Sequence, residues 1–554
     1  MCGIFAVMNS TINVKCDTFV KAQFTKGKNR GPETSSLKNI SINAIFGFHR
    51  LAINGLDDIS NQPIQIDNIT LICNGEIYNY KELYKLMDII PVTNSDCEVI
   101  IHLYKRYGIK QTLKMLDGVF AFALCDDKYN NLSSHIYIAR DPYGVRPLYY
   151  LNNVNNVNNN IPIIGVASEL KMLYEFCNET PSTISQFKPG TFSSFYLDNN
   201  VLSCWKNDYN GIYHEPGFSL NLVNFNMKWI NHGIQQFLIQ AIDKRYLTTE
   251  RPIACLLSGG LDSSLITALI NEIHKTRTTE PLETYSIGLF GSEDLRNAQI
   301  VSKYLGTNHT EIVVTETEMF DIIPELIYTI ESYDTTTVRA SIGNYLLGKY
   351  ISKNSKAKVI FNGDGSDELC GGYLYMNYCK DIIEFDKETR RLLEDIHLFD
   401  VLRSDKCISS NGLEPRTPFL DRNFVNFYLS IPPSIRCHSY NSQVEKYLLR
   451  NAFSIDNFKN SDNKQILPNE ILWRRKEAFS DGVSNKTKSL YQILQDFIVP
   501  KYDTNIKPIE AEKKYYKSLF TQYYPESLNI IPYYWMPKYT ETEDPSARTL
   551  NTYK

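Results

Sequence analysis

The chain has 554 residues, a length that ordinarily divides into about two to four domains. Its hydrophobic fraction of 43% and charged fraction of 22% are ordinary for globular proteins with a sizeable core. Its formal net charge of -4 lacks the basic excess that nucleic acids and anionic membranes attract, so we expect neither as a partner.

The N-terminal stretch and the cysteines favour a cytoplasmic setting. The run Met1–Val7 has no basic segment and its apolar character stops at Asn9, which is not typical of a secretory signal. No stretch is long and apolar enough to span a bilayer. The 12 cysteines are scattered, without a C-x-x-C pair or zinc spacing, and this favours reduced thiols.

Residues 1–205 form the first predicted domain. Short β-rich runs alternate there with Gly, Asn and Pro, a pattern typical of strands and turns. The runs are Ile42–Phe48, Ile69–Cys73, Val119–Leu124, Ile136–Ala139 and Leu148–Leu151. The asparagine-rich stretch 152–160 predicts a surface hairpin insertion. The polar and aromatic residues 206–224 predict a linker.

Residues 225–537 change to an alternation of helix and strand. Helices are expected over Met227–Tyr246 and from about Ser263 to His274, and buried strands over Ile253–Leu257, Tyr285–Leu289 and Lys358–Phe361. This order predicts a parallel α/β sheet, followed from about Tyr373 by a mostly helical part. The polar residues 538–554 are expected to form a mobile tail.

Cys2 is the sharpest single feature of the first domain. Once Met1 is removed, Cys2 carries a thiol nucleophile and an α-amine whose unperturbed pKa of about 7.7–8.0 suits a general base. The alternative is that Cys2 is a small buried apolar residue. Four further segments, 48–51, 74–79, 95–98 and 140–148, lie at expected strand ends, a helix start and a rigid turn, and each has an ordinary structural explanation.

Together these segments resemble the class II glutamine amidotransferases, with Cys-Gly-Ile-Phe at the start as the most specific element. The resemblance implies an α+β N-terminal-nucleophile hydrolase sandwich in which Cys2 attacks the glutamine amide. It assigns the α-carboxylate to Arg50, the α-ammonium to Asp96, and the oxyanion hole to Asn74 and Gly75. Further glutamine contacts fall to Leu51, Ile53 and Glu76. The family's His-Arg-Gly-Pro-Asp loop reads here as Asn29-Arg30-Gly31-Pro32-Glu33.

The segment Leu256–Ser264 lies between an expected strand and helix and has the character of a phosphate cradle. It is not a Walker A loop, and an empty Gly-rich turn is the alternative. Ser-Gly-Gly-x-Asp-Ser resembles the pyrophosphate loop of the N-type ATP pyrophosphatases. That resemblance implies ATP and Mg²⁺, with the metal on Asp262 and Asp367. The implied ATP-binding residues are Leu256, Leu257, Ser258, Gly259, Gly260, Asp262, Ser263, Ile287, Asn362 and Gly363.

Segments 333–341, 414–421, 444–450 and 473–483 extend the resemblance to the asparagine synthetase family over nearly the whole chain. In that resemblance Thr336, Thr337 and Arg339 contact aspartate or the phosphates, and Lys446 stabilises charge near the α-phosphate. The family's Ser-Gly-Glu-Gly-Ser-Asp-Glu loop carries Asn362 and Asp364 here, and we expect Asp364 to keep the glutamate's catalytic role.

The resemblance implies that glutamine supplies ammonia, that ATP adenylates aspartate, and that the aspartyl adenylate is aminated to asparagine. Two alternatives stay open: a related amidotransferase-ligase that acts on another carboxylate, and a catalytically silent family member. Glutamine, aspartate and ATP are the expected small-molecule partners. The sequence does not settle the oligomeric state, and a homodimer stays open.

Overall fold

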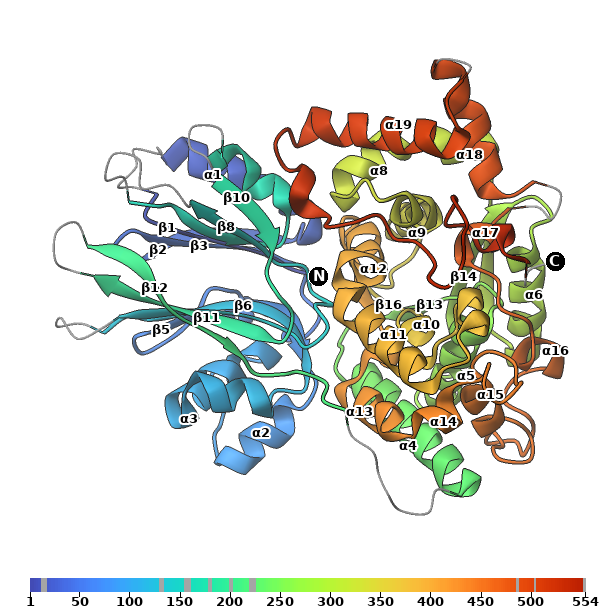
Figure 1. Cartoon of the computed structure of the whole chain (residues 1–554). Helices are drawn as coiled ribbons and strands as arrows, with labels where there is room; N and C mark the ends of the chain where they lie inside the picture. The colour runs from blue at the N-terminus through green and yellow to red at the C-terminus, as the bar shows by residue number, and fades with distance from the viewer. Residues whose placement is uncertain are drawn as a thin grey trace.

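The computed structural model describes residues 1–10, 17–128, 134–153, 161–177, 182–198, 203–218, 226–484, 488–502 and 505–551. They form two halves side by side, with the N-terminus between them (Figure 1). No helix within these ranges is long and apolar enough to cross a membrane. Most of the expected hairpin insertion, residues 154–160, lies outside the described residues.

The first half contains two six-stranded antiparallel sheets stacked as a sandwich (Figure 1). The first sheet has the order β10 (Ser182–Gln186), β8 (Tyr149–Asn153), β9 (Ile164–Ala167), β1 (Gly3–Met8), β3 (Ala44–Arg50), β2 (Thr34–Ser41). The second has the order β12 (Cys204–Ile212), β11 (Thr191–Asp198), β7 (His135–Arg140), β6 (Gly118–Asp126), β5 (Ile69–Ile77), β4 (Ile64–Ile66). Buried side chains of both sheets, such as Phe46 and Ile72, share one core between them.

Helices cover the outer faces of this sandwich. Helix α1 (Asp17–Thr25) packs on the first sheet, and α2 (Tyr80–Met87) and α3 (Val99–Met115) pack on the second. The predicted α+β sandwich is therefore confirmed. The predicted start of the linker at residue 206 is wrong, because β12 continues to Ile212 and pairs with β11 along its length.

The second half is built on a parallel sheet of order β15 (Asn308–Val314), β14 (Glu283–Leu289), β13 (Ile253–Leu256), β16 (Val359–Phe361), β17 (Glu414–Arg416). One face packs against α8 (Ile323–Ile330) and α9 (Thr335–Asn354), and the other against α4 (Met227–Leu247) and α5 (Leu261–Lys275). The strand order reverses between β13 and β16. Ligands of open α/β sheets bind beyond the carboxyl ends of the strands at such a reversal.

The other helices of this half surround the sheet, mostly after β16, as expected. They are α6 (Glu293–Leu305), α7 (Glu316–Asp321), α10 (Ser366–Cys370), α11 (Ile382–Asp395), α12 (Asp400–Ser409), α13 (Arg422–Ser430), α14 (Pro433–Arg436), α15 (Tyr447–Ala452), α16 (Asn469–Leu472), α17 (Phe479–Gly482), α18 (Leu490–Ile498) and α19 (Pro508–Tyr523).

The prediction of a mobile tail from residue 538 is wrong for residues 538–551. Asp544 pairs with Arg339 at 2.8 Å, and Leu550 is buried. Polar composition suggested mobility, but these polar groups bind buried partners that the sequence does not reveal.

Candidate active sites

Cys2 lies at one end of the first sheet, immediately before β1. Gly3 faces His49 across the β1–β3 pair, so Cys2 and Arg50 lie at the same edge. The Cys2 thiol donates to the Leu51 carbonyl at 3.5 Å. Burial raises the pKa of the Cys2 thiol, and the N-terminal ammonium partly offsets that rise. A nearby base is therefore needed to form a thiolate at neutral pH.

Arg50 is held in place by the loop that follows β3. Its Nη1 donates to the Asp57 carbonyl at 2.8 Å and to Asn61 Oδ1 at 2.7 Å, and its Nη2 donates to the Gly55 carbonyl. All three acceptors are uncharged oxygens, so none of these contacts pairs the guanidinium with a carboxylate. Arg50 is thus a fixed cation beside Cys2, as the recognition of a substrate carboxylate requires.

Asn74 and Gly75 lie inside β5 rather than after it, because this strand continues to Ile77. A Cβ at Gly75 would lie 2.4 Å from the Val119 carbonyl oxygen, so only glycine fits against β6. The Asn74 side chain is fully buried, and its amide donates to Ser168 Oγ at 3.5 Å. The expected strand Ile69–Cys73 ended before both residues, and the longer observed strand holds them in its ladder.

Two of the residues assigned to glutamine binding, Glu76 and Asp96, have buried carboxyl groups. Asp96 accepts from the Ile77 amide at 2.6 Å, and burial raises its pKa to about 6. Glu76 accepts from Asn54 Nδ2 at 2.6 Å and lies 3.4 Å from Arg416 of the second half. Burial also raises the pKa of Glu76.

The altered loop 29–33 is well anchored. Arg30 donates to the Cys2 carbonyl at 3.0 Å, and Pro32 bridges to Arg50. Glu33 accepts from the Ala52 amide at 2.7 Å and pairs with Arg251 of the second half at 2.7 Å. The longer Glu33 side chain thus ties the glutamine-side loop to the other domain.

The glycine-rich loop after β13 lines a cavity at the strand-order reversal. Gly259 has a φ of 71°, and a Cβ there would lie 2.4 Å from the Asn297 backbone, so this turn requires glycine. Helix α5 begins beyond Gly260 without a side-chain cap. Its first amides are therefore available to an anion, which the helix dipole also favours.

The loops after β13 and β16 touch at the reversal. A Cβ at Gly363 would lie 2.8 Å from the Ser263 nitrogen, so glycine permits this approach. Leu256, Leu257 and Ile287 line the cavity's apolar side, as expected for an adenosine site. Except for Gly259, the residues expected to bind ATP line this cavity, and the hydroxyls of Ser258 and Ser263 are hydrogen-bonded at 3.0 Å.

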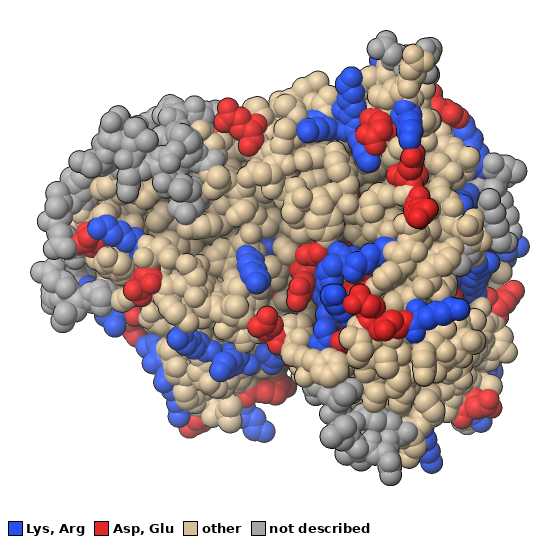
Figure 2. All heavy atoms as spheres, in the orientation of Figure 1, with Lys and Arg blue, Asp and Glu red and all other residues tan. Residues whose placement is uncertain are grey.

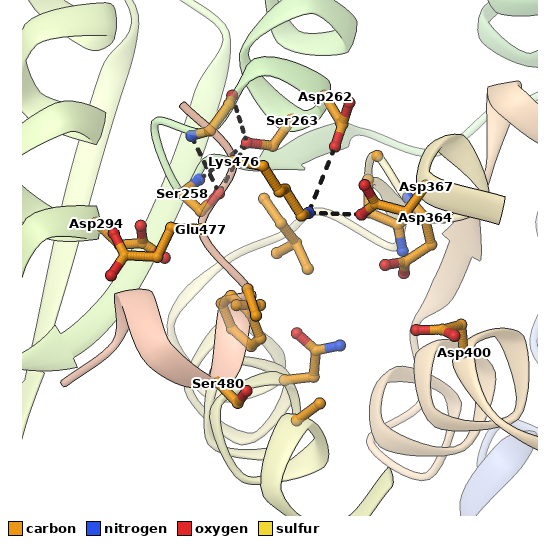
Figure 3. A pocket seen from close by; sticks show the side chains of 18 of the residues that line it. Ser258, Asp262, Ser263, Asp294, Asp364, Asp367, Asp400, Lys476, Glu477 and Ser480 are labelled. Carbon is orange, nitrogen blue, oxygen red and sulfur yellow. Dashed lines mark hydrogen bonds and ion pairs between the residues drawn. The ribbon is translucent and has the colours of Figure 1, made fainter. Parts of the chain in front are cut away.

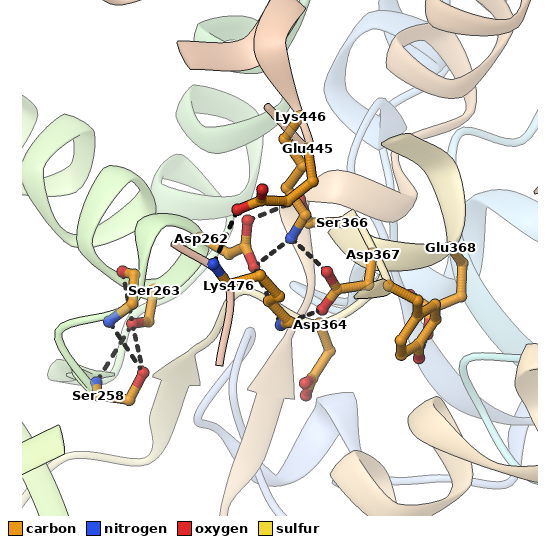
Figure 4. Close-up of polar contacts among 12 residues, drawn as sticks. Ser258, Asp262, Ser263, Asp364, Ser366, Asp367, Glu368, Glu445, Lys446 and Lys476 are labelled. Atoms are coloured by element: carbon orange, nitrogen blue, oxygen red, sulfur yellow. Dashed lines mark hydrogen bonds and ion pairs between the residues drawn. The ribbon is translucent and has the colours of Figure 1, made fainter. Parts of the chain in front are cut away.

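Two carboxylates and two lysines meet at the mouth of this loop (Figure 4). Lys446 Nζ lies 2.6 Å from Asp262 and 2.5 Å from Asp367, and Lys476 Nζ lies 2.5 Å from Asp367. Burial alone would lower the pKa of Lys446, but the two carboxylates more than offset it and raise that pKa. Lys446 also adopts a φ of 58°, a left-handed backbone conformation that is uncommon for residues other than glycine.

Asp262 and Asp367 fit a magnesium site by their chemistry and convergence. They come from different loops, and both approach one lysine ammonium within 2.6 Å. Mg²⁺ typically takes one or two carboxylates together with phosphate oxygens. Among the described residues, no group of three or more His, Cys, Asp or Glu side chains is placed to hold a metal ion by itself, so phosphate would have to complete the coordination.

Asp364 faces the cavity opposite the pyrophosphate loop (Figure 3). Its carboxylate lies 3.3 Å from Arg403 Nη2, and the same nitrogen lies 2.8 Å from Asp400. Arg403 belongs to α12 and is 7% exposed. This guanidinium holds the shortened acidic side chain inside the cavity, and the sequence expectation did not include Arg403 or Asp400.

The structure separates the three residues expected to bind aspartate. Thr336 and Thr337 line the cavity at the start of α9, and Thr336 Oγ1 is buried with no hydrogen-bond partner among the described residues. Arg339 is absent from the cavity lining; it pairs with Glu512 at 2.7 Å and Asp544 at 2.8 Å. The Arg339 guanidinium is thus occupied by two carboxylates of the protein, and its contact with a substrate stays a prediction.

Lys476 was missed as a site residue, although its segment was identified. It follows Trp-Arg-Arg in the sequence, and three neighbouring cations offered no basis for choosing one. The geometry distinguishes them. Lys476 binds Asp367, whereas Arg474 donates to the Gly259 carbonyl at 3.0 Å and fixes the glycine-rich loop.

Helix α12 connects the two sites. Asp400 and Arg403 face the cavity, whereas Asp405 pairs with Arg30 of the first half at 2.8 Å and Lys406 pairs with Glu169 at 3.0 Å. All four charges of these two interdomain pairs are buried. On the face in Figure 2, acidic and basic side chains gather beside the hollow in the second half, and the rest of that face is mostly uncharged.

Comparisons with known proteins agree with both halves. The glutamine amidotransferase domain family matches residues 1–204, and the asparagine synthase family matches residues 233–382 and 380–536. Asparagine synthetase [glutamine-hydrolyzing] from Gallus gallus is 39% identical, and the proteins of that name from Cricetulus griseus and Homo sapiens are 38% and 37% identical. Each alignment covers 100% of this chain and 99% of the relative.

A solved structure, NMN synthetase from Francisella tularensis, aligns with 41% of this chain and 92% of its own at 12% identity and a TM-score of 0.19, too low to support an argument. The relatives and the two family matches decide the assignment. The chain belongs to the glutamine-hydrolysing asparagine synthetase family.

Proposed function

We propose that this chain transfers the amide nitrogen of glutamine to the side-chain carboxylate of aspartate, while ATP is cleaved to AMP and pyrophosphate. The observation that carries the proposal is the presence of both sets of groups in one chain: a half-buried thiol beside a fixed guanidinium, and a glycine-rich anion loop facing Asp364. Relatives named for this activity align over the whole chain.

In the first half, the Cys2 sulfur attacks the glutamine amide carbon, and the carbon–nitrogen bond then breaks to release ammonia. Arg50 binds the α-carboxylate and ionised Asp96 binds the α-ammonium. The Asn74 side-chain amide and the Gly75 N–H stabilise the negative oxygen of the tetrahedral intermediate. Water hydrolyses the resulting thioester and releases glutamate.

The proton balance of this step requires a base. We infer that removal of Met1 exposes the Cys2 amine, which takes the thiol proton and delivers it to the departing nitrogen. Met1 is buried, and its amine lies near Glu414, Arg146 and Arg30 at the domain interface. Its removal would therefore open space on the side of Cys2 that faces the second half.

In the second half, the aspartate side-chain carboxylate attacks the α-phosphorus of ATP, and pyrophosphate leaves. The amides at the start of α5, Ser258 and Ser263 hold the pyrophosphate, and Lys446 and Lys476 offset the charge that develops on it. Asp262 and Asp367 would hold Mg²⁺, which would supply further neutralisation of phosphate charge. The mixed anhydride has AMP as a good leaving group.

Ammonia then attacks the β-carbonyl carbon of the adenylate, and AMP leaves. The attacking nitrogen must lose a proton, and Asp364 is the carboxylate at the cavity wall that we assign to accept it. Arg403 positions Asp364 through their 3.3 Å contact. Buried surroundings protect the adenylate from water.

One assay tests this function against both alternatives. The chain, in which Met1 has been removed by an aminopeptidase in the expression host, is mixed with glutamine, aspartate, ATP and Mg²⁺, and pyrophosphate and asparagine are measured. We expect both in a 1:1 ratio, and neither without aspartate. Release of pyrophosphate with another carboxylate but not with aspartate would overturn the assignment of aspartate as the substrate. No release with any carboxylate would overturn the assignment of catalytic activity.

The same chemistry suits a reducing compartment such as the cytoplasm. Cys2 must keep a free thiol to act as a nucleophile, and it forms no disulfide in the structure.

A further inference from the structure

The C-terminal segment 535–550 lies across the face of the second half. In Figure 1 it is the dark red trace that passes in front of α9 and α12 and ends beside α17. We call it the C-terminal strap. Four of its residues, Trp535, Asp544, Ser546 and Arg548, contact segments that form opposite walls of the ATP cavity.

Trp535 makes the first contact. Its amide donates to Asp334 Oδ1 at 2.8 Å, while Asp334 Oδ2 accepts from the Thr337 amide and hydroxyl, both at 2.8 Å. Asp334 is therefore the cap of α9 and is shared between the strap and that helix. Trp535 and Thr337 both line the cavity, so this end of the strap is part of the aspartate-side wall.

Asp544 makes the second contact, with Arg339 in α9. Both carboxylate oxygens accept from the guanidinium at 2.8 Å, a bidentate pair in which Arg339 is 3% exposed. The same guanidinium binds Glu512 of α19. Arg339 therefore fastens the strap to the helix that carries Thr336 and Thr337, which explains its position one turn beyond them.

Arg548 makes the third contact, with the opposite wall. Its Nη2 donates to Glu477 Oε1 and to the Asp481 carbonyl, both at 2.9 Å. Ser546 Oγ donates to the Asp481 carboxylate at 3.2 Å. Glu477 lines the cavity and follows Lys476, whose ammonium binds Asp367 at the pyrophosphate end.

We propose that the strap positions the wall 474–482 against the start of α9, so that Arg548 is a positioning residue that sets the affinity of the second half for ATP. Without Arg548, Glu477 and the Asp481 carbonyl lose a shared guanidinium, and the backbone that carries Lys476 gains freedom. Arg474 and the Leu289–Val483 backbone hydrogen bond still hold this wall. The loss should therefore be partial, and should act on ATP binding more than on the chemical step.

This inference rests on the proposed function, because it takes the ligand of the cavity to be ATP. The two fail differently. If the proposed function fails, the unmodified chain releases no pyrophosphate from ATP with aspartate and ammonia. If only the strap inference fails, the unmodified chain is active and Arg548 variants bind ATP as it does.

The test compares Arg548→Ala, Arg548→Lys and a matched control, Glu543→Ala. Glu543 belongs to the strap, but its ion pair with Lys507 is exposed and remote from the cavity lining. We expect Arg548→Ala to raise the KM for ATP in ammonia-dependent synthesis about tenfold, as loss of a hydrogen bond to a charged group would. Arg548→Lys should recover part of that loss, and Glu543→Ala should not change it.

Glutaminase activity serves as the internal control for folding, since Cys2 and Arg50 lie in the other half. Equal KM values for ATP in Arg548→Ala and Glu543→Ala would overturn the inference. A general loss of stability in Arg548→Ala would lower ATP affinity for another reason, so a second measurement uses the unmodified chain. A non-hydrolysable ATP analogue should slow hydrogen exchange of the amides in 544–551, and unchanged exchange there would overturn the inference.

Discussion

The glutamine site and the ATP cavity keep their functional side chains in place by different means. In the first half, Arg50 lies at the end of a strand and is bound by neutral acceptors, and Asn74 and Gly75 lie within a strand. In the second half, Asp262 and Asp367 are bound by Lys446 and Lys476, on loops beyond the strands. The first site is preorganised, whereas the second holds its charges against one another until a ligand replaces these contacts.

Because of this difference, the two sites should respond to different kinds of substitution. A site whose groups are held by neutral acceptors and by a strand loses function when a reacting group is removed, but its geometry depends little on ion pairs. A site of opposed charges must exchange internal ion pairs for contacts with Mg²⁺ and pyrophosphate, so its behaviour should depend on each charge and on the segments that carry it. Variants in the two halves should therefore separate cleanly.

The largest effect is expected for the nucleophile. Cys2→Ala removes the thiol, so glutamine-dependent asparagine formation should fall by at least about a thousandfold, while ammonia-dependent formation stays at the parent rate. Asp262→Ala should do the reverse, losing pyrophosphate release and keeping glutaminase activity. Parallel assays of glutamate, pyrophosphate and asparagine measure both variants. Normal synthesis from glutamine by Cys2→Ala would show that another group is the nucleophile.

The next effect concerns the shortened acid of the cavity. Asp364→Ala should slow asparagine formation from ammonia on the order of a hundredfold, the usual contribution of a positioned base, and leave glutaminase activity intact. Asp364→Glu should remain active, because it restores the longer side chain. The measurement is the rate of asparagine formation by both variants at saturating substrates. A parent-like rate for Asp364→Ala would transfer the role to Asp367 or Glu368.

The pH dependence should also differ between the halves. Burial raises the pKa of Asp96 to about 6, so in the free enzyme this carboxyl is protonated, and unable to bind an ammonium, below that pH. The kcat/KM for glutamine should thus fall about tenfold per pH unit below about pH 6, because this ratio reports groups of the free enzyme. Asp96→Asn should remove the activity. A pH profile that stays flat down to pH 5 would exclude Asp96 from glutamine binding.

The smallest effect is expected where the halves touch. Arg251 of the second half pairs with Glu33 of the glutamine-side loop, and both side chains are about a third exposed. Pairs of this kind contribute up to about 1 kcal/mol, so Arg251→Gln should raise the KM for glutamine by no more than about fivefold. Ammonia-dependent synthesis should not change. A larger increase, or an effect on ATP, would show stronger coupling between the halves than the ion pair explains.

Much of the architecture could be predicted from local patterns. The buried apolar runs at Ile253–Leu257 and Tyr285–Leu289 became β13 and β14 within two residues of the expected ends. Strand β17 was missed because it has only three residues, one of them Pro415, and apolar periodicity cannot identify so short an edge strand. Strand β15, at the other edge of the sheet, was also missed, because its first residues are not buried and form no continuous apolar run.

The sequence could predict only those parts of the candidate sites that belong to local motifs. The Ser-Gly-Gly-x-Asp-Ser loop has a fixed geometry, so its residues meet as expected in the cavity. Arg339 lies in an equally recognisable segment, but its partners Glu512 and Asp544 are 173 and 205 residues away in sequence. Arg403 likewise reaches Asp364 from a different element. Such long-range pairings have no local signal.

The most direct test of the account follows the nitrogen atom through both halves. The chain is incubated with glutamine labelled with ¹⁵N in the side-chain amide, with aspartate, ATP and Mg²⁺, and with unlabelled ammonium at a concentration too low to support synthesis alone. The account predicts asparagine with ¹⁵N in its side-chain amide, formed together with equal amounts of AMP and pyrophosphate. Release of labelled ammonia with no labelled asparagine, or formation of ADP and phosphate instead, would contradict it.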